Sequence, residues 1–234
     1  MEITFTQEEQ NRLVDVLTEM GTAYTISGRD AAKDKLTALQ EDISVRIGYP
    51  EFHFKPMHKE NIMHLTDILA RVDSPVPVVG ELGAWTGDSS TIIGDWLKTR
   101  KGGAHIIVEW FKGCIGVPEG DFRELFEDNM KEYEYELLDE ESGEAAERIP
   151  DDTFDFFFID ADHRYHMVRR DIELWYPKVK KGGLLAGHDY DSEEYDELYI
   201  EDDIVDEVHH GVTKAVNERF GIPHNENHMW WIRK

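Results

Sequence analysis

The spacing of apolar and polar residues divides the chain into two parts. In the first part, apolar positions recur at helical spacing in three segments, 7–19, 27–43 and 61–72. The first of these helices starts in a capping box, Thr6 to Glu9, whose end residues can bind each other's backbone N–H groups. We therefore expect residues 1–75 to form a helical N-terminal extension that serves as a cap or as an oligomer arm.

From residue 76 onwards, short apolar runs alternate with amphipathic segments. The runs predict strands over 77–82, 104–109, 134–138, 154–160, 184–187 and 229–232. The amphipathic segments predict helices over 88–99, 121–132, 143–149, 164–176 and 204–219. Repeated β-α-β units with short loops favour a parallel sheet that helices cover on both faces. We expect residues 76–234 to form one α/β domain with a doubly wound, Rossmann-like sheet.

Length and composition fit one substantial core, because the chain has 234 residues of which 40% are hydrophobic. No apolar run approaches the length of a bilayer span, and the start at Met1 lacks the basic and apolar regions of a signal peptide. The single cysteine, Cys114, excludes an intrachain disulfide and fits a reducing compartment. We expect a cytoplasmic protein without a membrane partner, and the amphipathic arm favours a homo-oligomer, most simply a dimer.

The chain is strongly acidic, with 50 Asp and Glu residues against 25 Lys and Arg and a formal net charge of −25. Such a charge repels nucleic-acid backbones and anionic lipids, which argues against both as partners. The acidic charge can be explained by solubility alone. The more specific alternative is that it serves to bind a cationic ligand or a metal. The acidic insert, residues 190–207, is either a solvated loop or a lid over an acceptor pocket.

A glycine loop follows the first predicted strand and is a candidate ligand site. Its spacing, from Glu81 through Gly83 to Gly87, is Glu-x-Gly-x-x-x-Gly and differs from the Gly-x-Gly-x-x-Gly of dinucleotide sites. Backbone N–H groups at the start of the following helix can face a ligand. An acid before the loop would repel a pyrophosphate and suits a cation.

Three of the first four predicted strands end in acids, namely Glu81, Glu109 and Asp160. In an open parallel sheet the carboxyl ends of the strands form the ligand crevice. Glu109 lies 22 residues after Gly87, where an acid can accept both hydroxyls of a ribose. Each acid alone can be a solvated strand end, but the three beside a glycine loop favour a nucleoside-like ligand.

Three segments of the α/β part carry a family signature, Glu81–Ser90, Phe154–His163 and Lys181–Tyr190. Together they resemble the class I S-adenosylmethionine-dependent methyltransferases. More narrowly, the chain is similar to the branch with macrocin- and mycinamicin-type sugar O-methyltransferases and cephalosporin hydroxylase-like proteins. The resemblance covers about 77–233 and implies the methyltransferase form of the doubly wound sheet.

The resemblance implies that the carboxyl edge of the sheet binds S-adenosylmethionine. Its methionine part, whose ammonium and sulfonium charges suit acids, would contact Glu81 and the loop residues Gly83, Ala84, Trp85, Gly87, Asp88 and Ser89. Glu109 would bind the ribose, and Asp160 would lie beside the cofactor. Ser142 would border the adenine and Glu141 would reach its exocyclic amine, although Ser142 is equally a plain helix N-cap.

The resemblance also implies a divalent cation at Asp160, His188 and Asp189, with Mg²⁺ or Mn²⁺ as the expected ion. Related enzymes often have a carboxylate where His188 stands. An oxygen-rich site suits Mg²⁺, whereas an imidazole shifts the preference toward Mn²⁺, Fe²⁺ or Zn²⁺. The alternative is that His188 and Asp189 only cap the turn after their strand.

His163 is the candidate catalytic base, with Asp160 beside it. Methyl transfer to an alcohol requires loss of the hydroxyl proton, which an imidazole can accept and a metal can ease. The matching histidine of the sugar methyltransferases has this role, and a helix-capping histidine is the alternative. The pair His209 and His210 shows no ligand spacing, and we expect it at the surface.

The predicted function is transfer of a methyl group from S-adenosylmethionine to a hydroxyl of a small molecule or sugar, assisted by a metal. If the acidic insert is a lid, it disfavours anionic acceptors and tolerates a sugar, a phenol or an amine. Two alternatives stay open. One is a hydroxylase-like metal enzyme with this fold, and the other is a non-catalytic nucleoside-binding or assembly subunit.

Overall fold

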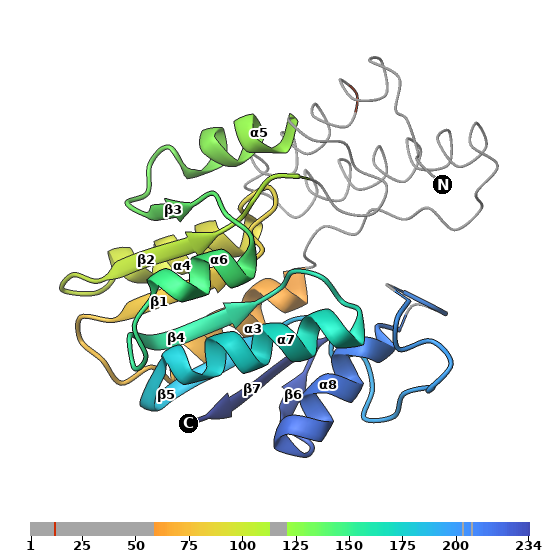
Figure 1. Ribbon diagram of the computed structural model, residues 1–234. Coiled ribbons are helices and arrows are strands. Elements are labelled where there is room, and N and C mark those ends of the chain that lie inside the picture. Colours follow the sequence, from red (N-terminus) through yellow and green to blue (C-terminus); the bar gives the residue numbers. More distant parts are fainter. Residues whose placement is uncertain (1–11, 13–58, 113–120, 203, 207) are drawn as a thin grey trace.

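The computed structural model describes Arg12 and residues 59–112, 121–202, 204–206 and 208–234 (Figure 1). Apart from Arg12, the helices expected over 7–19 and 27–43 lie outside the described residues. Within the described part of the chain, no helix is both long enough and apolar enough to cross a bilayer.

Seven strands form a single sheet in the order β3-β2-β1-β4-β5-β7-β6 (Figure 1). Their bounds are β1 Val78–Leu82, β2 Ala104–Val108, β3 Glu136–Leu138, β4 Phe154–Ile159, β5 Val179–Gly187, β6 His224–Glu226 and β7 Met229–Arg233. The first five are parallel, as predicted, while β7 runs antiparallel to β5 and β6 antiparallel to β7. The sequence analysis missed β6 because its three residues are polar and exposed, so they show no alternation of apolar positions.

The helices found in the described residues match those predicted there. Their bounds are α3 Lys59–Leu69, α4 Asp88–Lys98, α5 Asp121–Met130, α6 Ser142–Arg148, α7 Tyr165–Trp175 and α8 His210–Phe220, with a short 3₁₀ turn η1 at Tyr176–Lys178. The main difference is α8, which begins at His210 instead of residue 204. Before it, the described residues include short turns at 197–198 and 200–201 and an isolated bridge between Val205 and Val208.

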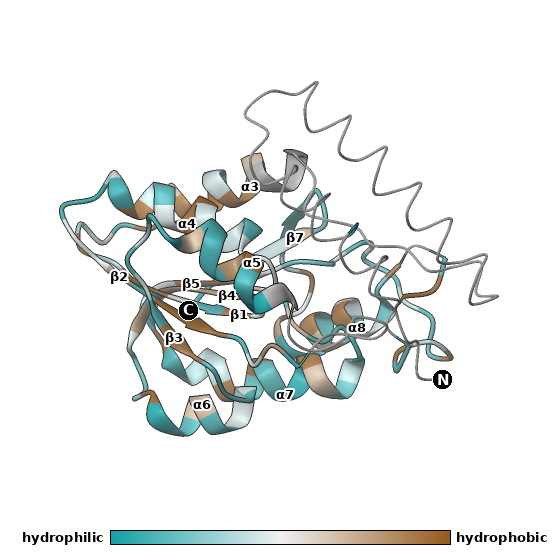
Figure 2. Ribbon diagram, turned by 90° about the horizontal axis from the view of Figure 1, so that it is seen from above, coloured by the Kyte–Doolittle hydropathy of each residue, from teal (hydrophilic) through white to brown (hydrophobic). Residues whose placement is uncertain are grey.

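Helices cover both faces of the sheet, which confirms the doubly wound architecture (Figure 2). Strand β4 shows why, because its side chains alternate between the two faces. Phe157 and Ile159 pack in the core under α6, α7 and α8, whereas Phe156 and Phe158 pack under α3 and α4. All four side chains are buried, and burial of each contributes about 1.5–3 kcal/mol.

Helix α3 belongs to the core of the α/β domain. Leu65, Ile68 and Leu69 are fully buried and pack with Ile93 of α4 and Phe156 of β4. This part of the expected extension therefore covers the sheet directly. A boundary near residue 75 stays a prediction.

Four parallel strands end at the same level of the sheet. In the register of the sheet, Leu82 of β1 pairs with Val108 of β2 and with Ile159 of β4, and Ile159 pairs with Gly187 of β5. The next residue after each strand end therefore lies at one edge. These residues are Gly83, Glu109, Asp160 and His188, all of which the sequence singled out.

Candidate active site at the carboxyl edge of the sheet

The loop after β1 has a backbone that glycine makes possible. Gly83, Trp85 and Gly87 have φ angles of 81°, 47° and 89°. A Cβ atom on Gly83 would lie 2.0 Å from the carbonyl oxygen of Asp160, so no larger residue fits there. Gly87 is the N-cap of α4 in the left-handed conformation. The two glycines thus let the chain turn sharply from strand to helix while it touches the end of β4.

Glu109 occupies the concave side of this loop. One carboxylate oxygen accepts hydrogen bonds from the backbone N–H groups of Ala84 and Trp85, both at 3.0 Å, and the other accepts from Phe111 N–H at 2.9 Å. Backbone N–H groups in such a loop commonly bind phosphate. Here a carboxylate takes that place, so the loop presents negative charge where a dinucleotide site presents free donors. A carboxylate has about four acceptor positions, which leaves capacity for ligand hydroxyls.

Glu81 supports the loop from beneath. It is fully buried and accepts hydrogen bonds from the hydroxyls of Ser89 and Ser90, the latter at 2.7 Å, and it contacts His105 Nε2 at 3.1 Å. These contacts tie the first turn of α4 to β1 and β2. Glu81 and the hydroxyl of Ser89 are therefore engaged inside the protein, and this geometry favours a supporting role over the direct ligand contact that we expected.

Glu141 and Ser142 make contacts toward α7. Glu141 is the N-cap of α6, where it accepts from Gly143 N–H at 2.9 Å, and its carboxylate pairs with Arg170 at 2.5 and 3.1 Å. The hydrogen bond from Arg170 lowers the pKa of Glu141. Ser142, which is not the cap, donates to Asp171 at 2.5 Å and accepts from Trp175 Nε1 at 2.9 Å. Contact of either residue with an adenine stays a prediction.

Asp171 is a buried acid below this corner of the sheet. Only 2% of the residue is exposed, and burial raises its pKa to about 7. The Ser142 hydroxyl and Arg170 oppose the rise without cancelling it. Near neutral pH both the neutral and the charged form of this carboxyl group are therefore populated.

The ends of β4 and β5 bring an aspartate into contact with three imidazoles. Asp189, whose side chain is 13% exposed, lies 3.0 Å from His163 Nε2, 2.9 Å from His188 Nδ1 and 3.4 Å from His209 Nδ1. Asp160 lies 3.8 Å from His163 Nε2. The structure thus brings together the predicted catalytic and metal-binding residues.

Charge within this cluster is balanced between acid and imidazole. Burial alone would lower the pKa of His188, but the charge of Asp189 and the hydrogen bond to it raise that pKa to about 9. Burial likewise would raise the pKa of Asp189, yet the neighbouring imidazoles hold it well below its ordinary value. Without a cation, His188 therefore carries positive charge at neutral pH beside an ionised Asp189.

His209 is a member of the cluster that the sequence analysis missed. Its side chain is 13% exposed, its ring lies edge-on to His163 with centroids 4.5 Å apart, and its expected place at the surface was therefore wrong. Asp191 fixes it, because the Asp191 carboxylate accepts from the backbone N–H of His209 at 2.7 Å and from its Nδ1 at 2.8 Å. No local spacing signals this contact, since 18 residues separate the two partners.

Two groups in the described residues have the composition and spacing of metal-ligand sets. One is the expected set, Asp160, His188 and Asp189, and the other is His163, Asp189 and His209. In each set the three ligand atoms lie within 4.8 Å of one another. The first set has two carboxylates, whereas the second has two imidazoles, so the two sets suit cations of different kinds.

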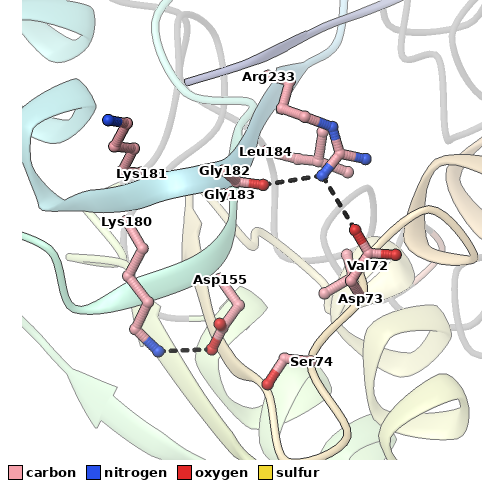
Figure 3. Close-up of a pocket in the computed structure, with 10 residues that line it drawn as sticks. All are labelled: Val72, Asp73, Ser74, Asp155, Lys180, Lys181, Gly182, Gly183, Leu184 and Arg233. Atoms are coloured by element: carbon pink, nitrogen blue, oxygen red, sulfur yellow. Dashed lines mark hydrogen bonds and ion pairs between the residues drawn. The ribbon is translucent and has the colours of Figure 1, made fainter.

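A hollow of about 370 Å³ lies far from these residues, at the amino ends of the strands (Figure 3). Lys180 points to Asp155 at 2.8 Å, and Arg233 binds the carbonyl of Gly182 at 2.8 Å and faces Asp73 at 3.5 Å. These cations are paired with acceptors of the protein itself. The chemistry of the carboxyl edge, rather than the size of this hollow, therefore defines the candidate site.

Comparison with known proteins gives one match to a protein family. Residues 81–190 match a protein family described as a methyltransferase domain, a range that runs from Glu81 to just past Asp189 and does not reach His209. This stretch of the chain is therefore similar to methyltransferase domains. No curated protein matches the chain.

Two solved structures share this fold at low identity, and a third is similar at a lower TM-score. A Staphylococcus aureus protein assigned provisionally as a caffeoyl-CoA O-methyltransferase is 15% identical, with 91% of this chain and 88% of that one covered and a TM-score of 0.53. CalS11, a TDP-rhamnose 3′-O-methyltransferase of calicheamicin biosynthesis, is 13% identical, with 99% and 97% covered and a TM-score of 0.50. An O-methyltransferase from Bacillus cereus, in complex with SAH, is 16% identical, with 76% and 74% covered and a TM-score of 0.48.

Proposed function

We propose that the protein transfers a methyl group from S-adenosylmethionine to a hydroxyl group of a small molecule or sugar. The observation that carries this proposal is the Glu109 carboxylate on the loop amides of Ala84 and Trp85, inside the matched methyltransferase domain. A site that presents carboxylate in place of free donors suits a nucleoside with a positive charge and no phosphate. S-adenosylmethionine has this chemistry.

The loop and the strand ends would each bind a different part of the cofactor. The backbone from Gly83 to Asp88 would hold the methionine part, with Glu81 and Ser89 fixing the loop from below. Glu109 would accept the ribose hydroxyls through the acceptor positions that the loop amides leave open. The turn at Glu141 and Ser142 would border the adenine through its backbone, because both side chains are engaged with α7.

When bound, S-adenosylmethionine supplies an electrophilic methyl group on sulfur, and the sulfur leaves as the neutral thioether of S-adenosylhomocysteine. The acceptor oxygen forms the new bond to carbon and loses its proton. His163 would take that proton, since it lies at the end of β4 with Asp189 and Asp160 beside it. Rate then depends on holding oxygen, methyl group and sulfur in line and on excluding water.

A divalent cation would ease the loss of that proton. Asp160, Asp189 and His188 form a donor set that fits Mg²⁺ or Mn²⁺, with the imidazole favouring Mn²⁺. The set lies at two adjacent strand ends, beside the candidate base. These residues would hold the cation, whose positive charge would favour the deprotonated form of an acceptor hydroxyl.

The acidic insert would form the acceptor side of the site. The insert lies beside His163, because the backbone carbonyl of Ile200 accepts a hydrogen bond from Tyr165 N–H at 2.7 Å. The chain is also closely packed there, since a Cβ on Gly211 would lie within 2.6 Å of the carbonyl oxygens of Ile200 and His163. Leu198 on the insert is 81% exposed and offers an apolar surface among the acids. Such a surface suits a neutral or basic acceptor, for example a sugar, a phenol or an amine, and repels anions.

The direct test is release of S-adenosylhomocysteine from the purified full chain, measured by mass spectrometry with a panel of sugars, phenols and amines, with and without Mn²⁺. Turnover with a hydroxyl acceptor supports the proposal. Binding of S-adenosylmethionine without turnover on any acceptor would instead favour a non-catalytic binding subunit. Absence of both binding and turnover would refute the proposal.

A further inference from the structure

The contacts of His209 suggest a second role for the Asp–His cluster. His209 is the N-cap of α8 and contacts His163, which follows β4, and Asp189, which follows β5. It lies 3.4 Å from Asp189, and its ring meets that of His163 at 70°. Three elements far apart in the chain thus contribute one imidazole, one carboxylate and a second imidazole to a single point.

We propose that His163, Asp189 and His209 form a binding position for a transition-metal ion such as Zn²⁺, distinct from the Asp160, His188 and Asp189 set. Two imidazoles and a carboxylate are ligands that Zn²⁺, Fe²⁺ and Mn²⁺ accept and that Mg²⁺ disfavours. Ligands about 2.0–2.2 Å from a Zn²⁺ ion lie about 3–4 Å from one another. His163 Nε2 lies 3.0 Å from Asp189, in that range, and the three ligand atoms of the set all lie within 4.8 Å of one another.

The support behind His209 is that of a metal ligand. Metal-binding histidines usually donate their second ring N–H to a carboxylate, which fixes the tautomer and the direction of the ring. Asp191 does this through Nδ1 of His209, at 2.8 Å, and also binds the backbone N–H. Among the described residues no hydrogen bond uses Nε2 of His209, which leaves that nitrogen for the cation. Asp191 is itself held on the other side by His228 Nδ1.

A metal ion at this position would affect catalysis at the carboxyl edge of the sheet. An ion bound to His163 withholds that imidazole from accepting a proton, so Zn²⁺ at this position would suppress a reaction in which His163 is the base. Metal binding itself does not depend on the proposed methyl transfer, since it uses only residues of the cluster.

The experiment is a calorimetric titration of Zn²⁺ into the untagged full chain, in the presence of a competing chelator. We expect His209→Ala to lower the affinity at least tenfold, and Asp191→Asn to lower it about tenfold through the ligand it supports. His210→Ala is the matched control, because His210 is the next residue and contacts Asp196 instead of the cluster. His188→Ala separates the two sets and should keep the affinity within about twofold of the wild type.

An unchanged affinity in His209→Ala would overturn the proposal, and so would a loss in His188→Ala as large as that in His209→Ala. Co²⁺ gives a second readout, because its visible absorption bands report imidazole ligands. These bands should weaken in His209→Ala and stay unchanged in His188→Ala. S-adenosylmethionine binding, measured on the same samples, shows that each variant is folded. Cofactor binding without Zn²⁺ binding would refute this inference alone, whereas Zn²⁺ binding without cofactor binding would refute only the proposed function.

Discussion

Glu109 accepts a hydrogen bond from the backbone N–H of Trp85 at 3.0 Å, across 24 residues of sequence. This contact joins the end of β2 to the loop after β1 and places a negative charge inside the loop. It distinguishes this edge from a phosphate-binding loop that otherwise has the same strand-to-helix geometry. Our assignment of the cofactor rests on this relationship.

The buried contacts of Glu81 predict a large loss of stability when this residue is truncated. In Glu81→Ala the hydroxyl of Ser90 and the ring of His105 lose their partner inside the core. We expect the free energy of unfolding to fall by about 2–4 kcal/mol, measured by chemical denaturation. Glu136→Ala, at an exposed position of β3, is the matched control and should change stability by less than about 0.5 kcal/mol. Similar losses in both variants would contradict the role of Glu81.

The place of His163 predicts a separation of binding from catalysis. His163→Ala should bind S-adenosylmethionine within about twofold of the wild type, because the loop and Glu109 are untouched. Its rate of methyl transfer should fall by about 10²- to 10⁴-fold, the usual contribution of a general base. His166→Ala, one residue into α7 and exposed beside Glu201, is the control and should transfer at the wild-type rate. A wild-type rate in His163→Ala would remove it from catalysis.

Asp171 predicts a pH dependence of stability. Its pKa is about 7 in the folded protein, whereas an unfolded aspartate titrates near 4, so between these values the folded state holds a proton that the unfolded state has lost. The stabilisation is therefore full below about pH 4 and is lost as the pH rises through about 7.

Asp171→Asn cannot ionise and removes this dependence. The melting temperature of the variant minus that of the wild type should increase by on the order of 5 °C between pH 5 and pH 8. Comparing the two proteins cancels most of the repulsion among the other acids of this −25 chain. A difference in melting temperature that does not change with pH would contradict the raised pKa of Asp171.

The sequence was sufficient for the framework of the fold. The apolar run Phe154–Ile159 and the acids after the strands predicted the parallel part of the sheet and its functional edge, because both are visible in the local sequence pattern. Strand β6 was missed because it has no apolar residues, and α8 was predicted to begin too early because Ile204, Val205 and Val208 continue the apolar spacing of that helix.

The directions of side chains were beyond the sequence. Glu81 and Ser142 were expected to face a ligand, but tertiary contacts with Ser90 and Asp171 engage their side chains within the protein. His209 joins the cluster through its contacts with Asp189 and Asp191, which lie 20 and 18 residues earlier in the chain. Such contacts depend on how loops pack, and no spacing along the chain encodes them.

The most direct test of the cofactor site is calorimetric titration of S-adenosylmethionine into the wild type and into Glu109→Ala. We predict binding at one site in the wild type and a loss of at least tenfold in affinity in the variant, with Glu136→Ala unchanged as the control. Binding that is equal in the wild type and Glu109→Ala, or no binding to the wild type, would contradict the account.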